Sequence, residues 1–284
     1  VFGEKVVIRL LNKDEKLLNI DKLGFSDKNL EKFKDLISRP NGIILVTGPT
    51  GSGKSTTLFA ALNKLNTVKK NIVTIEDPVE YQFQGINQVH AKPQINLTFA
   101  RTLRSILRQD PDIIMVGEIR DEETAQIAVR AALTGHLVLS TVHTNDAIKT
   151  ISRLVDMGVA PYLVSSSLIG VLSQRLVRRI CNNCKEKYKP NFDEIEYLQR
   201  EDVEYLYRGE GCQRCNQTGY VGRMAVHELL IIDSKIRQMI NEGKDEDEIK
   251  SYSLEKGMIT LREDGINKLK KGLTTLEEIK KIII

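Results

Sequence analysis

Residues 48–55 read Gly-Pro-Thr-Gly-Ser-Gly-Lys-Ser, which is the composition and spacing of a phosphate-binding loop. An apolar, β-branched run at residues 43–47 precedes the loop, and a helical pattern follows at residues 56–65. A strand, a glycine turn and a helix start direct several backbone N–H groups at one point, where the helix dipole also favours negative charge. A glycine-rich turn that matched by chance would lack this context. The loop therefore predicts binding of a nucleoside triphosphate, ATP, together with Mg²⁺.

The positions of the loop have separate predicted roles. Lys54 is expected to reach the β- and γ-phosphates, and the Ser55 hydroxyl to take one Mg²⁺ position. Thr56 is expected to contact the α-phosphate. The predicted nucleotide-binding set is Gly48, Pro49, Thr50, Gly51, Ser52, Gly53, Lys54, Ser55 and Thr56.

Three more predicted strands end in side chains that suit phosphoryl transfer. They are residues 71–75 with Glu76 and Asp77, residues 111–118 with Glu118, and residues 136–141 with His143. Because ligands of a parallel α/β sheet bind at the carboxyl ends of its strands, we expect these side chains and the loop to share one crevice. Metal-assisted phosphoryl transfer needs charge neutralisation, a positioned water and a sensor of the terminal phosphate. Each acid alone could be a solvated cap, so the prediction of ATP hydrolysis rests on the set.

The strand that ends at Glu118 departs from the usual pattern of P-loop ATPases. That strand normally ends in an Asp that holds Mg²⁺, often followed by a Glu that polarises water. Here Gly117 takes the Asp position and Glu118 the next one. We expect Glu118 to act as the catalytic base, and Glu76 and Asp77 to surround the metal in place of the missing Asp.

The two histidines around the fourth predicted strand differ in setting. His136 begins the buried strand and could be a satisfied core histidine. His143 lies just past the end of the strand, where contact with the γ-phosphate is geometrically reasonable. We therefore expect His143 to belong to the catalytic set.

The four cysteines form two Cys-x-x-Cys pairs, Cys181 with Cys184 and Cys212 with Cys215. Paired knuckles can give tetrahedral thiolate coordination, the usual arrangement for structural zinc. The separation between the pairs exceeds the compact ribbon spacing, so a helical hairpin at residues 193–207 is expected between them. A closed four-thiolate site has no open position, so no zinc chemistry is expected.

Other uses of the cysteines fit the sequence less well. A redox pair would need a thioredoxin-like setting, and two matched motifs argue against it. Two disulfides are disfavoured in a chain with no export signal. His227 could be a spare zinc ligand, although its place on a predicted strand, residues 224–230, favours an ordinary polar residue.

The pattern of the whole chain predicts an α/β fold. Strand and helix alternate continuously from residue 41 to about residue 176, as a RecA-like P-loop NTPase sheet with helices on both faces requires. A zinc-knuckle module and a C-terminal helical region follow. The expected regions are residues 1–20, the end of an upstream β-containing domain; 21–176, the RecA-like ATPase core; 177–230, the tetracysteine zinc module; and 231–284, the C-terminal helical region.

Composition limits the partners. The chain has 42 Lys and Arg against 38 Asp and Glu, a net charge of +4, 5% aromatic residues and no Trp. This near-balance and the scarcity of stacking residues argue against a nucleic-acid partner. No apolar run approaches the roughly 18 residues that span a bilayer, and no signal peptide is evident. The chain begins at Val1 without a Met, just before a strand-like run at residues 6–11, so we expect a fragment of a longer protein.

Three segments carry a resemblance to a known family. They are Glu-Asp-Pro-Val-Glu at residues 76–80, Gly-Glu-Ile-Arg-Asp at residues 117–121 and Gly-His-Leu-Val-Leu-Ser-Thr-Val-His-Thr-Asn at residues 135–145. These segments resemble the aspartate box, the atypical Walker B strand and the histidine box of the type II secretion and type IV pilus ATPases. The resemblance extends to residues 98–112 and 261–265, and so covers nearly the whole chain.

The resemblance implies an ATP-hydrolysing motor that powers assembly of a type IV pilus or a type II secretion pseudopilus. Such motors are hexameric rings at the cytoplasmic face of the inner membrane, so an inner-membrane platform protein is the implied partner. The four cysteines favour the pilus-assembly and secretion branches over the retraction branch, which generally lacks the zinc site. A secretion role rather than a pilus role, a nucleotide-gated scaffold and a nucleic-acid translocase are the alternatives.

The resemblance also implies a use for some arginines. Arg101, Arg104 and Arg108 recur at helical spacing and share one face, which is ordinarily solvated or paired with acids. In the resembling family, arginines in this segment and at the end of the upstream domain approach the triphosphate, some of them from the neighbouring subunit. On this basis Arg104 and Arg9 are candidates for neutralising the charge that develops during hydrolysis.

Overall fold

The centre of the molecule is a seven-stranded sheet in the order β3-β2-β4-β5-β1-β6-β9. The computed structural model describes residues 3–6, 18–200 and 202–282. Each neighbouring pair of strands is parallel except β6 and β9, which are antiparallel. The strands of this sheet are β1 (Gly42–Thr47), β2 (Ile72–Glu76), β3 (Asn87–His90), β4 (Ile113–Val116), β5 (Leu137–Val142), β6 (Leu168–Ile180) and β9 (Tyr220–Ile231).

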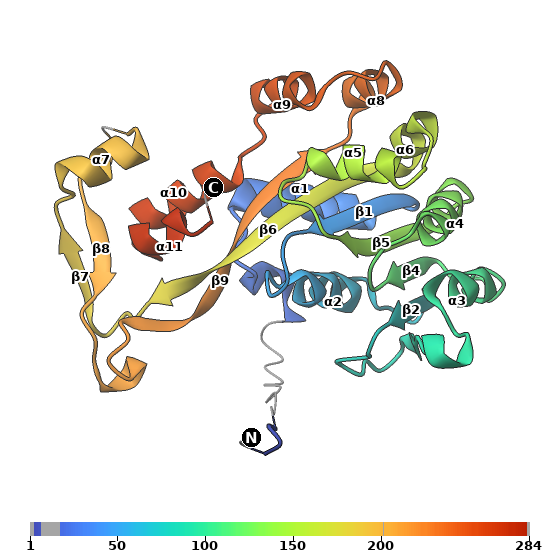
Figure 1. Ribbon diagram of the computed structural model, residues 1–284, viewed down its shortest axis with the longest axis horizontal. Coiled ribbons are helices and arrows are strands. Elements are labelled where there is room, and N and C mark those ends of the chain that lie inside the picture. Colours follow the sequence, from blue (N-terminus) through green and yellow to red (C-terminus); the bar gives the residue numbers. More distant parts are fainter. Residues whose placement is uncertain (1–2, 7–17, 201, 283–284) are drawn as a thin grey trace.

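Helices cover both faces of this sheet (Figure 1). Successive strand residues point to opposite faces, so Ile43 and Leu45 of β1 join one apolar core while Ile44 and Val46 join the other. Helices α1 and α2 belong to the second core, and α3 to α6 with α8 and α9 belong to the first. The helices of the core are α1 (Asp27–Ser38), α2 (Lys54–Leu65), α3 (Phe99–Ile106), α4 (Glu122–Leu133), α5 (Lys149–Asp156) and α6 (Pro161–Ser167), with short 3-10 helices at Ile20–Lys22 and Pro93–Ile95.

The four central strands β1, β2, β4 and β5 are buried at every position. Parallel sheets are covered on both faces, and their strands therefore read as continuous apolar runs. These four strands were therefore recognisable in the sequence as continuous apolar runs. The α/β fold with a mostly parallel central sheet is confirmed.

The long antiparallel pair β6 and β9 extends beyond the sheet and leads to a small projecting module (Figure 1). The module contains the two-stranded sheet β7 (Lys185–Tyr188) and β8 (Leu206–Gly209), the helix α7 (Phe192–Leu198) and a 3-10 helix at Gln213–Cys215. A third apolar core joins α7 and β8 to α10 and α11. Both long strands run through the expected boundaries near residues 176 and 230, so the division into domains stays a prediction.

The helical hairpin predicted at residues 193–207 is wrong. Among the described residues of this range, only α7 is helical, and β8 forms the other arm by pairing antiparallel with β7. Residues 205–207, Tyr-Leu-Tyr, favour a strand, and the segment Lys185–Tyr188, some distance away along the chain, supplies the partner for it. The two cysteine pairs are therefore joined by a β-hairpin with a helix at its end.

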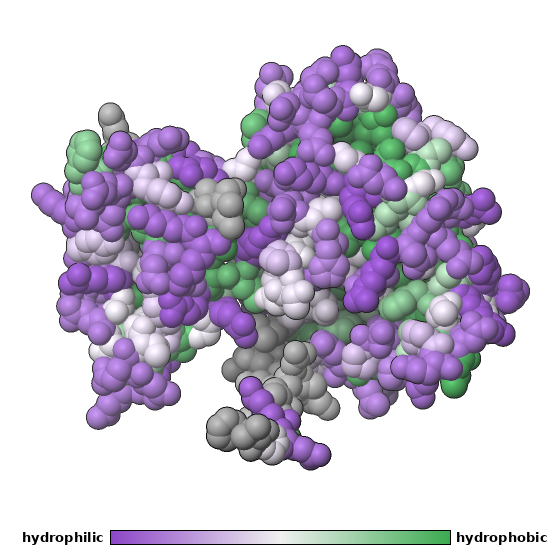
Figure 2. Space-filling model, in the orientation of Figure 1, coloured by the Kyte–Doolittle hydropathy of each residue, from purple (hydrophilic) through white to green (hydrophobic). Residues whose placement is uncertain are grey.

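The C-terminal region is helical, as expected, and lies over the β6–β9 pair and beside the core. Its helices are α8 (Ser234–Asn241), α9 (Glu246–Glu255), α10 (Leu261–Lys270) and α11 (Leu276–Lys280). Each begins at a side chain that caps it, from Asp233, Asp245, Thr260 and Thr275. The visible face of the molecule is mainly hydrophilic (Figure 2). Among the described residues, none of the helices combines the length and apolarity needed to cross a bilayer.

Candidate functional site

The loop between β1 and α2 has the geometry of an anion-binding turn. Gly48 and Gly53 have φ values of 146° and 87°, which only glycine adopts at low cost. A Cβ on Gly48 would lie 2.5 Å from the carbonyl oxygen of Gln174, so the position also has no room for a side chain. Helix α2 begins at Lys54 with no side-chain cap. Its first N–H groups are therefore available to an anion, as in phosphate-binding loops.

Lys54 lies inside this loop, with its side chain folded over the turn. The residue is 9% exposed, and its Nζ donates to the carbonyl oxygens of Gly48 at 2.9 Å and Pro49 at 3.1 Å. Burial lowers the pKa of the Lys54 ammonium, the negative charge of Glu118 opposes this shift, and the positive charge of Arg175 adds to it. The ammonium is thus held beside the loop by weak acceptors that a phosphate can replace.

A crevice of about 550 Å³ lies next to the loop and receives residues from several strand ends. Residues 50–56 of the loop line it continuously. Gly48 and Pro49 line an adjacent hollow of about 390 Å³ instead, and His143 lines both spaces. The other polar residues of the crevice are Glu76, Asp77, Glu80, Glu118, Arg120, Thr141 and Arg223.

Glu118 lies at the end of β4 with its carboxylate partly enclosed. The side chain is 16% exposed, and Oε2 lies 2.6 Å from Arg120 Nε and 3.5 Å from His143 Nε2. The preceding Gly117 is tightly packed, because a Cβ there would lie 3.2 Å from the carbonyl oxygen of Ile75. The close approach of β2 and β4 therefore restricts position 117 to a small residue and leaves Glu118 as the carboxylate of this strand end.

Glu76 ends β2 and is almost fully buried, with 4% exposure. Its Oε1 accepts hydrogen bonds from Thr74 Oγ1 at 2.5 Å and Gln88 Nε2 at 3.0 Å. Burial raises the pKa of Glu76, and these two hydrogen bonds oppose the shift. Asp77 is half-exposed, with Oδ1 3.8 Å from His90 Nε2. The two acids thus offer the crevice one buried, hydrogen-bonded carboxylate and one exposed carboxylate.

The segment that carries His143 is tied to the strand before the phosphate-binding loop. Thr47 Oγ1 accepts from the Thr144 N–H at 2.9 Å and lies 2.6 Å from Thr144 Oγ1. These contacts fix His143 relative to the loop, although its own ring is half-exposed. His136 is not a core histidine: it lies one residue before β5 and is only partly buried, with Nδ1 2.8 Å from the Ala131 carbonyl oxygen.

Of the two candidate arginines, the structure describes Arg104. Arg104 is 51% exposed on α3 and pairs with Glu123 of α4 at 2.5 Å, outside the residues that line the crevice of its own chain. Arg9 lies outside the described residues. Arg120 and Arg223, which sequence reasoning did not assign a role, do line the crevice. Arg120 could have been found from its position two residues after Glu118, but Arg223 comes from β9 and has no local signal.

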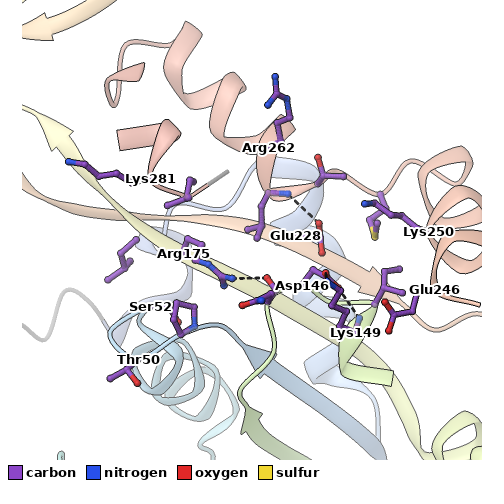
Figure 3. Close-up of a pocket in the computed structure, with 18 of the residues that line it drawn as sticks. Thr50, Ser52, Asp146, Lys149, Arg175, Glu228, Glu246, Lys250, Arg262 and Lys281 are labelled. Atoms are coloured by element: carbon purple, nitrogen blue, oxygen red, sulfur yellow. Dashed lines mark hydrogen bonds and ion pairs between the residues drawn. The ribbon is translucent and has the colours of Figure 1, made fainter. Parts of the chain in front are cut away.

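A second cavity, of about 800 Å³, lies between the phosphate-binding loop and the C-terminal helices (Figure 3). Glu228 of β9 is buried there and accepts the N–H groups of Ala147 at 2.9 Å and Leu261 at 3.3 Å. Burial raises the pKa of Glu228, and these two bonds oppose the shift. One carboxylate thus joins the segment after β5 to the start of α10, a link that sequence reasoning missed.

The four cysteine sulfurs come together at the base of the projecting module. The sulfurs of Cys181, Cys184, Cys212 and Cys215 all lie within 4.8 Å of one another. Three of the pairs are separated by 3.7 to 3.8 Å. A tetrahedral zinc site with Zn–S bonds of about 2.3 Å has sulfurs about 3.8 Å apart, so the cluster fits that metal. His227 is not part of the cluster; it is fully buried, with its ring stacked on Phe25.

The family described as "Type II/IV secretion system protein" matches residues 1–281. The type IV pilus assembly ATPase PilB of Thermus thermophilus is 57% identical over 283 residues, which are 98% of this chain and 32% of that protein. Type II secretion system protein E of Dickeya dadantii is 52% identical over 281 residues, 99% of this chain and 56% of that protein.

A solved structure supports the same relationship. The crystal structure of the pilus retraction motor PilT with bound ADP has a TM-score of 0.69 and 37% sequence identity, and it covers 93% of this chain and 66% of that chain. The chain spans about a third to a half of the length of the curated relatives named above. The match over nearly all of its own length nevertheless places the chain in a family: it belongs to the type II/IV secretion system proteins.

Proposed function

We propose that the protein binds ATP with Mg²⁺ in the crevice beside residues 48–56 and hydrolyses it. The observation that supports this most directly is the meeting of the phosphate-binding loop, Glu76, Glu118 and His143 around one space. A scaffold that only binds nucleotide would need the loop but not a partly enclosed carboxylate opposite it. The proposal agrees with the name of the relative from Thermus thermophilus, the type IV pilus assembly ATPase PilB.

The chain supplies a residue for each requirement of direct hydrolysis. Backbone N–H groups and Lys54 would hold the phosphates, and Ser55 would hold Mg²⁺, with Glu76 and Asp77 close by. Mg²⁺ neutralises phosphate charge when bound. Glu118 would take a proton from the water whose oxygen attacks the γ-phosphorus. The bond from that phosphorus to the β–γ bridging oxygen breaks, which gives ADP and inorganic phosphate without a covalent intermediate.

We further propose that this hydrolysis drives assembly of a type IV pilus or a type II secretion pseudopilus. Relatives that are 50 to 57% identical to this chain over the aligned residues carry names from both systems, and they do not separate the two roles. The working form would be a hexameric ring at the cytoplasmic face of the plasma membrane, acting on an inner-membrane platform protein. Within each subunit, residues 21–176 would form the RecA-like ATPase core.

We also propose that Cys181, Cys184, Cys212 and Cys215 hold one structural zinc ion. The fit of the sulfur separations to a tetrahedral thiolate site supports this, as does the position of the cluster where β6 and β9 meet the small β7–β8 sheet. The zinc would join residues 177–230 into one module and would take no part in hydrolysis.

Release of inorganic phosphate from ATP tests the proposed activity. The protein should release phosphate in a Mg²⁺-dependent reaction, and excess chelator should abolish the release. Added single- or double-stranded DNA or RNA should leave the rate unchanged, because the near-balanced charge and the low aromatic content argue against a nucleic-acid partner. ATP binding without any turnover, by protein assembled with its membrane partner, would favour the nucleotide-gated scaffold; stimulation by nucleic acid would favour a translocase.

A further inference from the structure

We propose that Gln174 is a positioning residue that holds the phosphate-binding loop in its nucleotide-binding shape. Gln174 lies on β6 and is 1% exposed. It is absent from the residues that line the crevice, so it acts on a nucleotide only through its neighbours. The inference deepens the proposed function, on which it rests for the identity of the ligand.

The sheet register brings Gln174 level with the start of the loop. Strand β6 runs parallel to β1, and Ser173 is the partner of Thr47, the last residue of β1. The next residues on the two strands are therefore Gln174 and Gly48. A Cβ on Gly48 would lie 2.5 Å from the Gln174 carbonyl oxygen, and one on Gly53 would lie 3.2 Å from Gln174 Nε2. Because Gly48 and Gly53 have no side chains, Gln174 can pack directly against the backbone of the loop at both positions.

The side-chain amide of Gln174 joins the two ends of the phosphate-binding segment. Its Nε2 donates to the Ser52 carbonyl oxygen at 2.7 Å, and its Oε1 accepts from Thr57 Oγ1 at 2.9 Å. Both partners are buried. Residues 53–56, which are predicted to contact the phosphates and Mg²⁺, lie between these two anchors. One amide therefore fixes the loop and the first turn of α2 to the same point of the sheet.

Figure 3 shows Ser52 close to β6, with Arg175, the neighbour of Gln174, projecting from that strand. Arg175 Nη2 donates to the Asn145 carbonyl oxygen at 2.7 Å, and so holds the segment after β5. Consecutive residues of β6 thus contact the two segments that carry the phosphate-binding loop and His143. Strand β6 therefore holds both the phosphate-binding loop and the segment after β5 in position through hydrogen bonds of Gln174 and Arg175.

An apolar residue at position 174 would keep the packing and remove this support. The Ser52 carbonyl and the Thr57 hydroxyl would remain buried without Gln174 as partner, which is costly unless the loop shifts to reach another one. Such a shift moves the N–H groups that lie between the two anchors. The consequence is lost nucleotide affinity, in addition to any loss of thermal stability.

The test compares ADP affinity, measured by calorimetry, across four variants well below their melting temperatures. Gln174→Met keeps the length of the side chain and removes both hydrogen bonds. Thr57→Val removes one of them from the other side, and the double variant combines the two changes. Ser173→Ala is the matched control, because Ser173 is buried on the same strand and, among the described residues, its hydroxyl has no hydrogen-bond partner.

We expect Gln174→Met to weaken ADP binding about 10- to 100-fold and to raise KM for ATP in parallel, while Ser173→Ala matches the parent. Thr57→Val should have a smaller effect, and the double variant should be little worse than Gln174→Met, because the two side chains share one hydrogen bond. The nucleotide-induced rise in melting temperature should shrink in the same order. A purely structural role would lower the melting temperature without nucleotide and leave this rise unchanged.

Parent-like ADP affinity in a folded Gln174→Met protein would overturn the inference. If that variant does not fold, Thr57→Val decides, and parent-like affinity there would overturn it equally. Failure of the proposed function gives a different result from failure of this inference, because the parent protein would then bind ADP but release no phosphate from ATP. In that case the ADP comparison still tests Gln174.

Discussion

At the scale of single residues, the crevice depends on charges that are held partly out of water. Lys54 and Glu118 are both largely enclosed, and the negative charge of Glu118 opposes the lowering of the Lys54 pKa that burial causes. Interactions between enclosed charges are stronger than between solvated ones. This arrangement stabilises a multiply charged ligand, and it makes the individual charges testable by substitution.

Lys54→Ala should weaken ATP binding about 10- to 100-fold, because it removes a charge-assisted contact to the phosphates. Lys64→Ala is the matched control, since Lys64 is exposed in the last turn of the same helix. Titration with a fluorescent ATP analogue measures both. Equal affinities in the two variants would mean that the lysine of the loop does not bind phosphate.

Glu76 predicts a pH dependence of stability. Its pKa is raised in the folded protein, mainly by burial, so the folded state binds the proton more tightly than the unfolded state does. The resulting stabilisation is present below the ordinary pKa of a glutamate and is lost as pH rises through the raised value. Glu76→Gln keeps an oxygen that can accept from Thr74 and Gln88 and removes the titration.

Urea unfolding at several pH values, in chelator, measures this effect. The free energy of unfolding of Glu76→Gln relative to the parent should increase as pH rises above about 4.5. Glu31→Gln, a change at an exposed acid of α1 outside the crevice, serves as the control. A difference between Glu76→Gln and the parent that does not change with pH would contradict the assignment.

The sequence predicted the site residues that belong to local motifs. It missed the residues whose partners in the site are far away along the chain. The phosphate-binding loop and the acids at the strand ends could be placed because each follows an apolar run. Gln174 could not, because its partners Ser52 and Thr57 are 122 and 117 residues away along the chain. Arg223 reaches the crevice from β9 for the same kind of reason.

At the scale of secondary structure, the ends of β1, β2 and β5 were predicted to within one residue and those of β4 to within two, whereas β6 and the module were not predicted. Strands covered on both faces read as continuous apolar runs whatever their order in the sheet. The segment between the cysteine pairs mixes charged and aromatic residues, and its β8 arm forms only because β7 lies beside it. Pairing between distant segments cannot be read from local periodicity.

The module itself provides a prediction. The purified protein should carry about one zinc per chain, and Cys212→Ser should release it and lower the melting temperature of the module by at least about 5 °C. The P-loop sheet should stay folded and still bind ADP, because the ligands lie at its far extension. Asn182→Ala is the control, since Asn182 is exposed between two of the cysteines.

Metal analysis and thermal unfolding, on protein prepared without chelator, check this prediction. Protein without zinc, or four cysteines that react freely with a thiol reagent, would rule out a structural zinc site. Equal zinc content in Cys212→Ser and in the parent would show that Cys212 is not a ligand.

At the scale of the whole molecule, the placement of Arg104 bears on the assembly. Arg104 is exposed and paired with Glu123, outside the crevice of its own chain. An arginine in that position can neutralise charge on a nucleotide only if the nucleotide belongs to a neighbouring subunit. The resemblance predicts the same for Arg9, which lies outside the described residues.

Mixing two impaired variants tests this arrangement. Arg104→Ala and Glu118→Gln should each hydrolyse ATP poorly as rings, and arginines that act across subunits contribute about 10³–10⁵ in rate elsewhere. Mixed rings contain interfaces where an intact Glu118 meets an intact Arg104, so part of the activity should return. Glu123→Ala is the control, because it breaks the ion pair within the chain and keeps the arginine. No recovery in confirmed mixed rings would place Arg104 outside catalysis between subunits.

The central claim is that this crevice hydrolyses ATP with Glu118 as the base, and the most direct measurement is phosphate release by Glu118→Gln. The amide keeps the shape of the side chain but cannot take a proton from water. We predict parent-like affinity for ATP together with a fall in kcat of about 10²–10⁴-fold. Turnover of ATP by Glu118→Gln at the parent rate would contradict the account.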